Sequence, residues 1–438
     1  MTLQVTPVRR LEGVVEVPGD KSISHRAALF GGLAKGQTEI TGFLEGEDCL
    51  GTIGAVRALG VEVARRGPGH YLVDGVGLSG LREPDDVIDC GNSGTTARLL
   101  MGILAGQPFW TVLTGDDSLR RRPMSRVAEP LRRMGATVVG RGGGGRLPLA
   151  VGGARPLRAL TYASPVASAQ VKTALVLAGL WADGAVTVTE PAVSRDHTER
   201  MLAAFGARIH VERRSVTITP GDELRGQPVA VPGDISSAAF LLVAGLIVPG
   251  ARVTVRNVGA NPTRTGLLDV LSAMGATLAF GTAGGGGAGE PACDLTVTGS
   301  PLRAATVGGD LIPRLIDEVP ALAVAACLAE GVTRIRDAAE LRVKESDRIR
   351  AIATELARMG AEITELPDGL EIRGGRRLRG AAVSSGGDHR MAMALVVAGL
   401  VAEGPSVVAD TACIATSFPE FPAAINALAG AACVTERP

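Results

Sequence analysis

The sequence predicts an α/β protein made of six similar repeats, grouped as two similar domains of three repeats each. Two observations support this prediction. An apolar run followed by a glycine and a short alternating segment occurs six times along the chain. The tetrapeptide VPGD occurs at 17–20 and again at 231–234, and each copy precedes an expected helix that opens with serine.

Each repeat is expected to contain two helices and the strands that follow them. The first helix is a buried run rich in Ala and Leu, and the alternating segment after it is typical of a strand. A glycine is expected to end this helix, because glycine readily adopts the conformation that follows a last helical turn. The six glycines are Gly36, Gly106, Gly184, Gly250, Gly331 and Gly404. The second helix is amphipathic and leads into another strand, at 56–63, 132–139, 203–211, 272–280, 357–364 and, more weakly, 426–434.

The repeats are too small to fold separately. One repeat spans about 70 residues, which bury too little apolar surface for a comfortable independent core, so neighbouring repeats must pack together. The two VPGD segments are separated by close to three repeats, and we expect the chain to cross between domains there. The predicted domains are residues 20–233, and residues 1–19 with 234–438, with a cleft between them.

Two glycine clusters, at 140–145 and 281–289, are expected to be hairpin tips, because each lies between two expected strands. The first cluster satisfies G-x-G-x-x-G in form, but it leads into RLPLAV, which is not a helix start. This context excludes a dinucleotide site.

Composition excludes several classes of protein. The 438 residues carry 45 Lys and Arg against 45 Asp and Glu, and 3% are aromatic, so a nucleic-acid-binding surface is not expected. The longest apolar stretch, 391–402, is much shorter than the roughly 20 residues of a membrane span. Six scattered cysteines without a CxxC pair indicate neither a zinc site nor a disulfide framework. We expect a soluble, cytoplasmic protein.

The segments that a repeated core does not explain are rich in Lys, Arg, Ser, Asn and Gly, and they stand at expected helix starts. The first, 18–26, places Lys21, Ser22 and Arg26 at a helix N-terminus, where unpaired N–H groups and the helix dipole favour an anion. Its glycine spacing does not fit a Walker P-loop. An ordinary helix cap is the alternative.

Two further anion sites are expected in the first half of the chain. At 89–98, a glycine turn with Asn92 and Gly94 would offer backbone N–H groups to a phosphate or carboxylate. At 115–124, three arginines ending with Arg122 precede a proline at a helix start, where they could clamp an anion. A solvated charge run is the alternative for the arginines.

Further polar segments open other helices, at 167–172, 194–199, 316–320, 341–348 and 387–390. In the second half of the chain, carboxylates beside Lys and Arg suit proton transfer next to bound anions, and structural salt bridges are the alternative for any single pair. Together these segments predict a cleft that binds a pair of small, multiply anionic substrates.

Seven segments, in order over nearly the whole chain, carry a family resemblance: PGDKSISHRA, GNSGTTARLL, GDDSLRRRPM, SAQVKTAL, SRDHTERM, LRVKESDRI and GDHRMAMAL. The chain resembles the 5-enolpyruvylshikimate-3-phosphate synthases, a family of enolpyruvyl transferases. The resemblance implies six βαβαββ units in two three-unit domains, joined by a two-stranded hinge as an inverse α/β barrel, that close on substrate. It also implies transfer of the enolpyruvyl (carboxyvinyl) group of phosphoenolpyruvate to the 5-hydroxyl of shikimate 3-phosphate, with release of phosphate. This reaction belongs to the shikimate pathway to chorismate and the aromatic amino acids.

The resemblance also implies the site residues. The expected ligands of shikimate 3-phosphate are Lys21, Ser22, Arg26, Ser168, Ala169, Gln170, Arg195, Asp317 and Lys344. The expected ligands of phosphoenolpyruvate are Lys21, Asn92, Gly94, Arg122, Gln170, Arg348 and Arg390. Asp317 would accept the proton of the 5-hydroxyl, Glu345 would protonate the enol carbon, and Lys21 is the third expected catalytic residue. The resemblance implies no cofactor or metal, no partner besides the two substrates, and a monomer.

Three residues depart from the pattern of many family members. Leu99 stands where Pro is common, Glu340 where Asn is common, and Thr416 where Lys is common. The last change removes a cation from the phosphoenolpyruvate side, which bears on the affinity for that substrate and for glyphosate, the inhibitor that mimics it. The small residue Gly94 favours access of the inhibitor.

Three alternatives are weaker. A UDP-N-acetylglucosamine enolpyruvyl transferase shares fold and donor, but it typically has Lys-Asn where this chain has Lys21 and Ser22, and a reactive Cys in the loop that here spans 115–123 without one. An RNA 3'-phosphate cyclase-like protein would need a surface suited to RNA. A binding protein without activity would not need Asp317 and Glu345 together.

Overall fold

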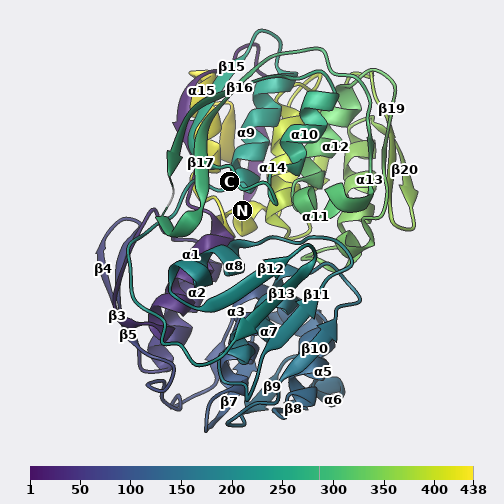
Figure 1. The fold of residues 1–438 in the computed structure, drawn as a ribbon. Helices are drawn as coiled ribbons and strands as arrows, with labels where there is room; N and C mark the ends of the chain where they lie inside the picture. The colour runs from purple at the N-terminus through teal and green to yellow at the C-terminus, as the bar shows by residue number, and fades with distance from the viewer. Residues whose placement is uncertain (286, 438) are drawn as a thin grey trace. The chain divides into compact units, whose positions relative to one another are not determined.

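The structure is a computed structural model that describes residues 1–285 and 287–437 (Figure 1). The chain divides into two compact lobes. Lobe 1 contains Met1–Pro18, Pro232–Gly284 and Pro291–Pro438, and lobe 2 contains Gly19–Val231 and Gly285–Glu290. The chain therefore passes from one lobe to the other four times.

Within the described residues, the strands form six four-stranded sheets, three in each lobe. In lobe 2 the strand orders are β14-β3-β5-β4, β6-β7-β9-β8 and β10-β11-β13-β12, and in lobe 1 they are β16-β17-β15-β2, β18-β19-β21-β20 and β22-β23-β1-β24. In every sheet one end strand pairs in parallel with its neighbour, and that neighbour pairs antiparallel with the third strand. In one sheet, for example, β6 is parallel to β7, and β7 is antiparallel to β9. The common strand order confirms the predicted α/β class and its repeats.

The strands of lobe 2 are β3 (Lys35–Thr41), β4 (Glu62–Gly67), β5 (His70–Val76), β6 (Ile88–Asp89), β7 (Trp110–Thr114), β8 (Thr137–Gly140), β9 (Leu149–Gly152), β10 (Leu160–Ala163), β11 (Val186–Thr189), β12 (Arg208–Glu212), β13 (Ser215–Thr219) and β14 (Val229–Ala230). Those of lobe 1 are β1 (Thr2–Val5), β2 (Glu12–Glu16), β15 (Arg252–Gly259), β16 (Thr277–Gly285), β17 (Pro291–Thr298), β18 (Thr306–Val307), β19 (Val332–Ile335), β20 (Glu362–Leu366), β21 (Gly369–Arg373), β22 (Ala382–Ser384), β23 (Ser406–Ala409) and β24 (Val434–Arg437). Strands such as β11 and β23 alternate between buried and half-buried residues, because one face of each sheet covers helices.

The helices of lobe 2 are α1 (Lys21–Leu33), α2 (Glu47–Ala58), α3 (Gly94–Ala105), α4 (Asp117–Arg121), α5 (Ser125–Arg133), α6 (Arg141–Gly144), α7 (Ala169–Gly179), α8 (His197–Ala204) and the short η1 (Gly287–Gly289). Those of lobe 1 are α9 (Ile235–Ile247), α10 (Gly266–Ala273), α11 (Ile312–Leu315), α12 (Val319–Leu328), α13 (Arg348–Arg358), α14 (His389–Gly399), α15 (Phe421–Ala429) and the short η2 (Gly309–Leu311), η3 (Ala339–Val343) and η4 (Thr411–Thr416). Three helices in each lobe are buried along almost their whole length: α1, α3 and α7 in lobe 2, and α9, α12 and α14 in lobe 1.

The predicted helix ends need one correction. Gly106 directly follows α3 and caps it. In contrast, α7 ends at Gly179, before Gly184, and α14 ends at Gly399, before Gly404. The glycines with positive φ, such as Gly250 and Gly404, instead shape the turn into the next strand.

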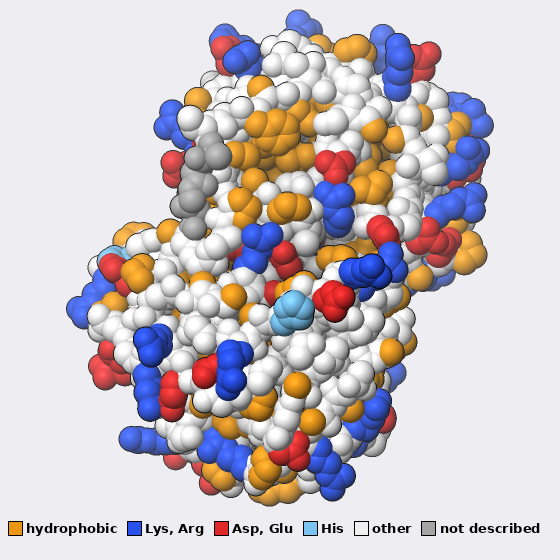
Figure 2. Space-filling model, in the orientation of Figure 1, with side chains coloured by type: hydrophobic (Ala, Val, Ile, Leu, Met, Phe, Trp, Pro, Cys, Tyr) orange, Lys and Arg blue, Asp and Glu red, His pale blue; other side chains and the backbone are white. Residues whose placement is uncertain are grey.

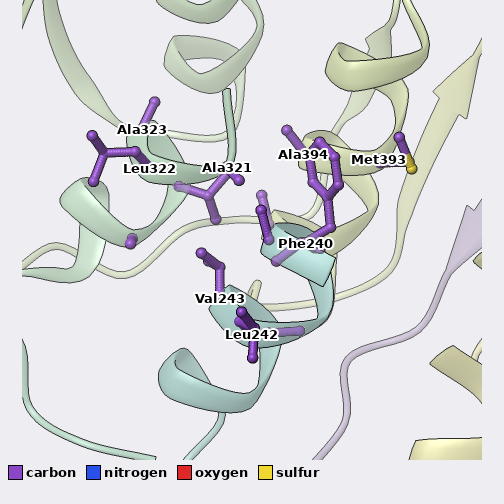
Figure 3. Packing of buried hydrophobic residues seen from close by; sticks show 14 of the residues in the cluster. Phe240, Leu242, Val243, Ala321, Leu322, Ala323, Met393 and Ala394 are labelled. Atoms are coloured by element: carbon purple, nitrogen blue, oxygen red, sulfur yellow. The ribbon is translucent and has the colours of Figure 1, made fainter. Parts of the chain in front are cut away.

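The core of lobe 1 forms where α9, α12 and α14 contact one another. Figure 3 shows side chains of these helices, among them Phe240, Ala321 and Ala394, pointing into a common interior. Phe240 is fully buried, and its ring meets that of Phe421 edge to face with centroids 6.2 Å apart. Lobe 2 has the corresponding pair Phe30 and Phe205, at 6.1 Å.

The two VPGD segments open the two lobes in the same way. The turn requires glycine in the first copy, because a Cβ on Gly19 would lie 1.8 Å from the carbonyl oxygen of Gly42. The aspartates that follow, Asp20 and Asp234, cap α1 and α9 by accepting backbone N–H groups. The strand before each helix pairs outside its own repeat: β2 precedes α1 but joins the β15 sheet of lobe 1, and β14 precedes α9 but joins the β3 sheet of lobe 2.

The lobe boundaries differ from those of the predicted domains, because Gly19 belongs to lobe 2 and Pro232 and Gly233 belong to lobe 1. Gly285–Glu290 also belongs to lobe 2, whereas the sequence predicts it in the domain of residues 234–438. Its last residue, Glu290, is buried and bonded to Nδ1 of His197 at 2.8 Å. The segment follows β16, which continues through much of the second glycine cluster to Gly285; residue 286 lies outside the described residues. The first cluster does connect the antiparallel strands β8 and β9, as expected.

The visible surface carries no concentrated patch of one charge. In Figure 2, Lys and Arg side chains are interspersed with Asp and Glu over the face shown. Among the helices that the structure describes, none is both long enough and apolar enough to cross a membrane.

Replacing Phe240 with Ala should lower the free energy of unfolding by about 3–5 kcal/mol, because the fully buried ring leaves a cavity among tightly packed helices. Urea denaturation would measure the change. Phe280→Ala is the matched control, since that ring is 61% exposed and its loss should cost little. Equal losses for the two variants would contradict the packing described.

Candidate functional site

The start of α1 holds an ammonium group at a helix N-terminus. Asp20 accepts a hydrogen bond from the backbone N–H of Ile23 at 2.9 Å, which caps the helix. Lys21, the first residue of the helix, is half-buried and forms an ion pair with Asp48 in the first turn of α2. The helix dipole and the ammonium together favour an anion at this point.

Arg26 lies one turn further along α1 and is buried. Its guanidinium donates to Thr198 Oγ1 at 2.7 Å, to Thr173 Oγ1 at 2.9 Å and to the carbonyl oxygen of Ser22 at 2.9 Å. Burial lowers the pKa of Arg26 to about 10, while the charge of Glu199 acts in the opposite direction. These bonds tie α1 to α7 and α8, and a direct bond from Arg26 to a substrate stays a prediction.

A buried polar chain joins the starts of α1, α2 and α3. His25 Nδ1 lies 2.7 Å from Thr52 Oγ1, which lies 2.6 Å from Thr96 Oγ1, and Thr96 in turn donates to Ser93 Oγ at 2.8 Å. Burial, together with the charges of two cations on the same helix, lowers the pKa of His25 well below 6.5. His25 is therefore neutral in the folded protein at pH 7.

Two guanidinium groups flank the start of α3. A Cβ on Gly94 would lie 2.7 Å from Nη1 of Arg98 and 3.5 Å from Nη1 of Arg122, so glycine leaves space beside both. Arg122 donates to the side-chain and backbone oxygens of Asn92, at 2.7 and 3.1 Å, and to Ser118 Oγ at 3.1 Å. The predicted ligands Asn92, Gly94 and Arg122 therefore lie together.

The start of α7 is joined to the same place. Gln170 donates to Thr95 Oγ1 at 2.9 Å and accepts from Nη1 of Arg98 at 2.5 Å. Ser168 and Ala169 open the helix and are half-buried. Arg98, which the sequence reading did not single out, thus links the α3 and α7 segments; its position four residues after Gly94, one helical turn, was the available signal.

Arg195, in the loop before α8, brings a further cation to the start of α1. Its Nη1 lies 3.4 Å from Ser22 Oγ. Lobe 2 therefore gathers three helix N-termini, those of α1, α3 and α7, and the predicted ligands at them. They are Lys21, Ser22, Arg26, Asn92, Gly94, Arg122, Ser168, Ala169, Gln170 and Arg195.

Lobe 1 gathers the other predicted residues around one carboxylate. Asp317 Oδ1 lies 3.0 Å from Arg348 Nη1 and 3.4 Å from Lys344 Nζ. Arg390 Nη2 lies 3.9 Å from Oδ2 of the same aspartate. Arg348 also donates to Glu345 Oε2 at 2.6 Å. Three cations thus surround one carboxylate, and a carboxylate in its ionised form can accept a proton.

Asp388, the N-cap of α14, fixes Arg348 from the other side. It accepts from Nε of Arg348 at 2.8 Å, from Ser346 Oγ at 3.0 Å and from the backbone N–H of Arg390 at 2.9 Å. Burial alone would raise the pKa of Asp388, but the charge of Arg348 lowers it. Burial would likewise lower the pKa of Arg348, but carboxylates led by Asp388 raise it. The pair is therefore ionised.

The three residues that depart from the family pattern have different surroundings. Leu99 is buried in α3, and Glu340 lies in the short helix η3. Thr416, at the end of η4, pairs through Oγ1 with Nδ1 of His389 at 3.0 Å and donates to the carbonyl oxygen of Cys413 at 2.8 Å. The threonine side chain thus packs against the start of α14.

In the part of the chain that the structure describes, no three or more His, Cys, Asp or Glu side chains are grouped so that they could hold a metal ion. The candidate site consists instead of helix N-termini, cations and carboxylates, which suit anionic substrates and proton transfer.

The chain is similar to known proteins in sequence and in fold. A family model described as "EPSP synthase (3-phosphoshikimate 1-carboxyvinyltransferase)" matches residues 5–425. A 3-phosphoshikimate 1-carboxyvinyltransferase of Geobacter sulfurreducens is 56% identical over 429 residues, covering 98% of this chain and 99% of the relative. One of Pelotomaculum thermopropionicum is 57% identical over 422 residues, covering 96% and 97%. The 2.37 Å structure of EPSP synthase from Acinetobacter baumannii has a TM-score of 0.88 and 44% identity, covering 99% of each chain.

The fold, two lobes of three four-stranded sheets each, is that of a carboxyvinyl transferase. The chain belongs to the EPSP synthase family.

The buried His25 should make stability depend on pH. Its pKa is lowered in the folded protein, so below pH 6.5 the unfolded chain takes up a proton that the folded chain does not. The free energy of unfolding should therefore fall by up to about 1.4 kcal/mol per pH unit as the pH drops below that value. Urea denaturation between pH 7.5 and 5.0 should show a shallower dependence for His25→Gln than for the wild type, and identical slopes would contradict the assignment.

Proposed function

We propose that the chain transfers the enolpyruvyl group of phosphoenolpyruvate to the 5-hydroxyl of shikimate 3-phosphate, giving 5-enolpyruvylshikimate 3-phosphate and phosphate. Membership of the EPSP synthase family and relatives named 3-phosphoshikimate 1-carboxyvinyltransferase support this activity. The reaction forms a bond between the acceptor oxygen and the carbon that bears the phosphate, and it breaks the bond from that carbon to the phosphate oxygen. The proton of the acceptor hydroxyl must be removed, and the methylene carbon must be protonated and then deprotonated.

The arrangement around Asp317 is the observation that carries the proposal. A general base for a sugar-like hydroxyl must be charged, and it must lie where an anionic substrate binds. The cations beside Asp317 support this role, because Lys344 and Arg348 lie within 3.4 Å of its Oδ1 and could also bind an anionic substrate. In the proposed reaction Asp317 accepts the hydroxyl proton, and Glu345, on the other side of Arg348, protonates the methylene carbon.

The groups of lobe 2 supply the second requirement, neutralisation of two phosphates and a carboxylate. Lys21, Ser22, Arg26, Ser168, Ala169, Gln170 and Arg195 are assigned to shikimate 3-phosphate, with Asp317 and Lys344 of lobe 1. Lys21, Asn92, Gly94, Arg122 and Gln170 are assigned to phosphoenolpyruvate, with Arg348 and Arg390 of lobe 1. Preorganised cations and N–H groups stabilise charge that develops in the transition state more than they stabilise the ground state. A cytoplasmic, monomeric enzyme with no partner other than its substrates stays a prediction.

The proposal is tested by phosphate release from phosphoenolpyruvate with purified protein. The acceptor is shikimate 3-phosphate, UDP-N-acetylglucosamine or none. Release with shikimate 3-phosphate alone supports the proposal. Release only with the nucleotide sugar would assign the related transferase activity, and no release with either would contradict both.

Replacing Asp317 with Asn should lower kcat by about 10²- to 10⁴-fold, the usual contribution of a positioned base, while shikimate 3-phosphate still binds. Phosphate release gives kcat, and isothermal calorimetry gives the affinity. Glu371→Gln is the matched control, since Glu371 pairs with Arg334 at 2.9 Å on the β21 sheet, outside the site. A kcat close to the wild-type value in Asp317→Asn would remove Asp317 from the proposed base role.

A further inference from the structure

Glu190 is a buried carboxylate that joins two of the segments described above. It follows β11 and is 4% exposed. Its Oε1 accepts the backbone N–H of Ser168 at 2.9 Å, and its Oε2 accepts the hydroxyl of Ser194 at 2.8 Å. One side chain therefore holds both the segment that opens α7 and the segment that leads into α8.

Lys172 balances this carboxylate. Its Nζ lies 2.9 Å from Glu190 Oε2 and 2.7 Å from Glu199 Oε1, and all three side chains are at most 5% exposed. Burial would lower the pKa of Lys172, but the two carboxylates raise it. The ammonium is therefore charged, and it lies against the same Glu190 oxygen that accepts the Ser194 hydroxyl.

The two segments that Glu190 joins carry the proposed phosphate ligands. Ser168 is the residue whose N–H it binds, and Ser194 directly precedes Arg195. Glu190 accepts the backbone N–H of Ser168 and both the hydroxyl and, at 3.4 Å, the backbone N–H of Ser194, so loss of the carboxylate would release both segments at once. The loop geometry between Ser168 and Arg195 thus depends on a residue that is not among the predicted ligands.

We propose that Glu190, bonded to Ser168, Ser194 and Lys172, is a positioning residue that sets the distance between Ser168 and Arg195 and thereby the affinity for shikimate 3-phosphate. This inference rests on the proposed function. Arg98 and Arg122 surround the groups assigned to phosphoenolpyruvate, and neither shares a described bond with Glu190. Gln170, on the same segment, is assigned to both substrates, but Ser168 and Arg195 are assigned to shikimate 3-phosphate alone, so the larger effect should fall on that substrate.

Glu190→Gln tests the inference with almost no change of shape. Whichever way the new amide turns, its NH₂ group faces a donor, either the Ser168 N–H or the Lys172 ammonium. Loss of a charged hydrogen bond corresponds to a rise of about tenfold to a hundredfold in KM for shikimate 3-phosphate. The KM for phosphoenolpyruvate should change by less than about threefold on the same scale.

Two further variants separate positioning from stability. Ser194→Ala removes the hydroxyl that donates to Glu190 Oε2 and should raise the KM for shikimate 3-phosphate by a smaller factor than Glu190→Gln. Val73→Ala, in the buried face of β5, should lower Tm without changing either KM. All variants are assayed by phosphate release beside the wild type, with Tm measured for each.

An unchanged KM for shikimate 3-phosphate in folded Glu190→Gln would overturn the inference, and so would equal rises in both KM values. If Glu190→Gln does not fold, Ser194→Ala decides in the same way. If the wild type is active and the variants have the same KM values as the wild type, the inference is refuted but the proposed function is not. A wild type that is silent with shikimate 3-phosphate refutes the proposed function, and the inference with it.

Discussion

The burial of three apolar helices in each lobe is the constraint on which the rest of the molecule depends. A helix without a polar face must be covered on all sides, and the three sheets of each lobe provide that cover. The polar groups of these helices are then confined to their ends. Because the first N–H groups of a helix have no partner within it, the buried N-termini require caps and oxygens from neighbouring segments. In lobe 2 Thr52 of α2 bonds both His25 of α1 and Thr96 of α3, and Gln170 of α7 bonds Thr95 of α3. The candidate site is this meeting place of helix ends, so its position follows from the packing.

The same turn serves different purposes in the two lobes. Asp20 and Asp234 cap equivalent helices after identical VPG sequences. After Asp20 comes Lys21, whose ammonium remains half-buried. After Asp234 comes the apolar Ile235, and the cap itself is bound to the buried guanidinium of Arg264 at 3.0 Å. In lobe 1 the predicted general base, Asp317, lies just before α12. A repeated scaffold thus presents cations at one set of helix ends and a carboxylate with its cations at the other.

Much of the fold could be predicted because the same helix–glycine–strand pattern occurs six times, and six copies are stronger evidence than one. Six copies of one pattern gave the number of sheets, and VPGD marked equivalent helix starts. Exact helix ends could not be predicted, because the C-caps of α7 and α9 are Leu180 and Val248, and neither is a residue type that signals a helix end. The residues of the candidate site were recognisable as motifs. Their partners, Asp48 for Lys21 and Asp388 for Arg348, lie 27 and 40 positions away along the chain, and only packing brings them together. That Gly285–Glu290 belongs to lobe 2 could not be predicted, because a glycine cluster indicates a turn but not which lobe the turn packs against.

The position of β1 has a consequence for how the protein is made. This strand, Thr2–Val5, lies between β23 and β24, and its residue partners run from Ser406 to Arg437. This strand therefore leaves the ribosome long before the residues of β23 and β24 with which it pairs. Lobe 2, in contrast, has most of its segments available once Val231 has emerged. Synthesis from the N-terminus thus favours an order in which lobe 2 condenses first and lobe 1 closes only after β24 has emerged, with contacts of long sequence separation limiting the rate.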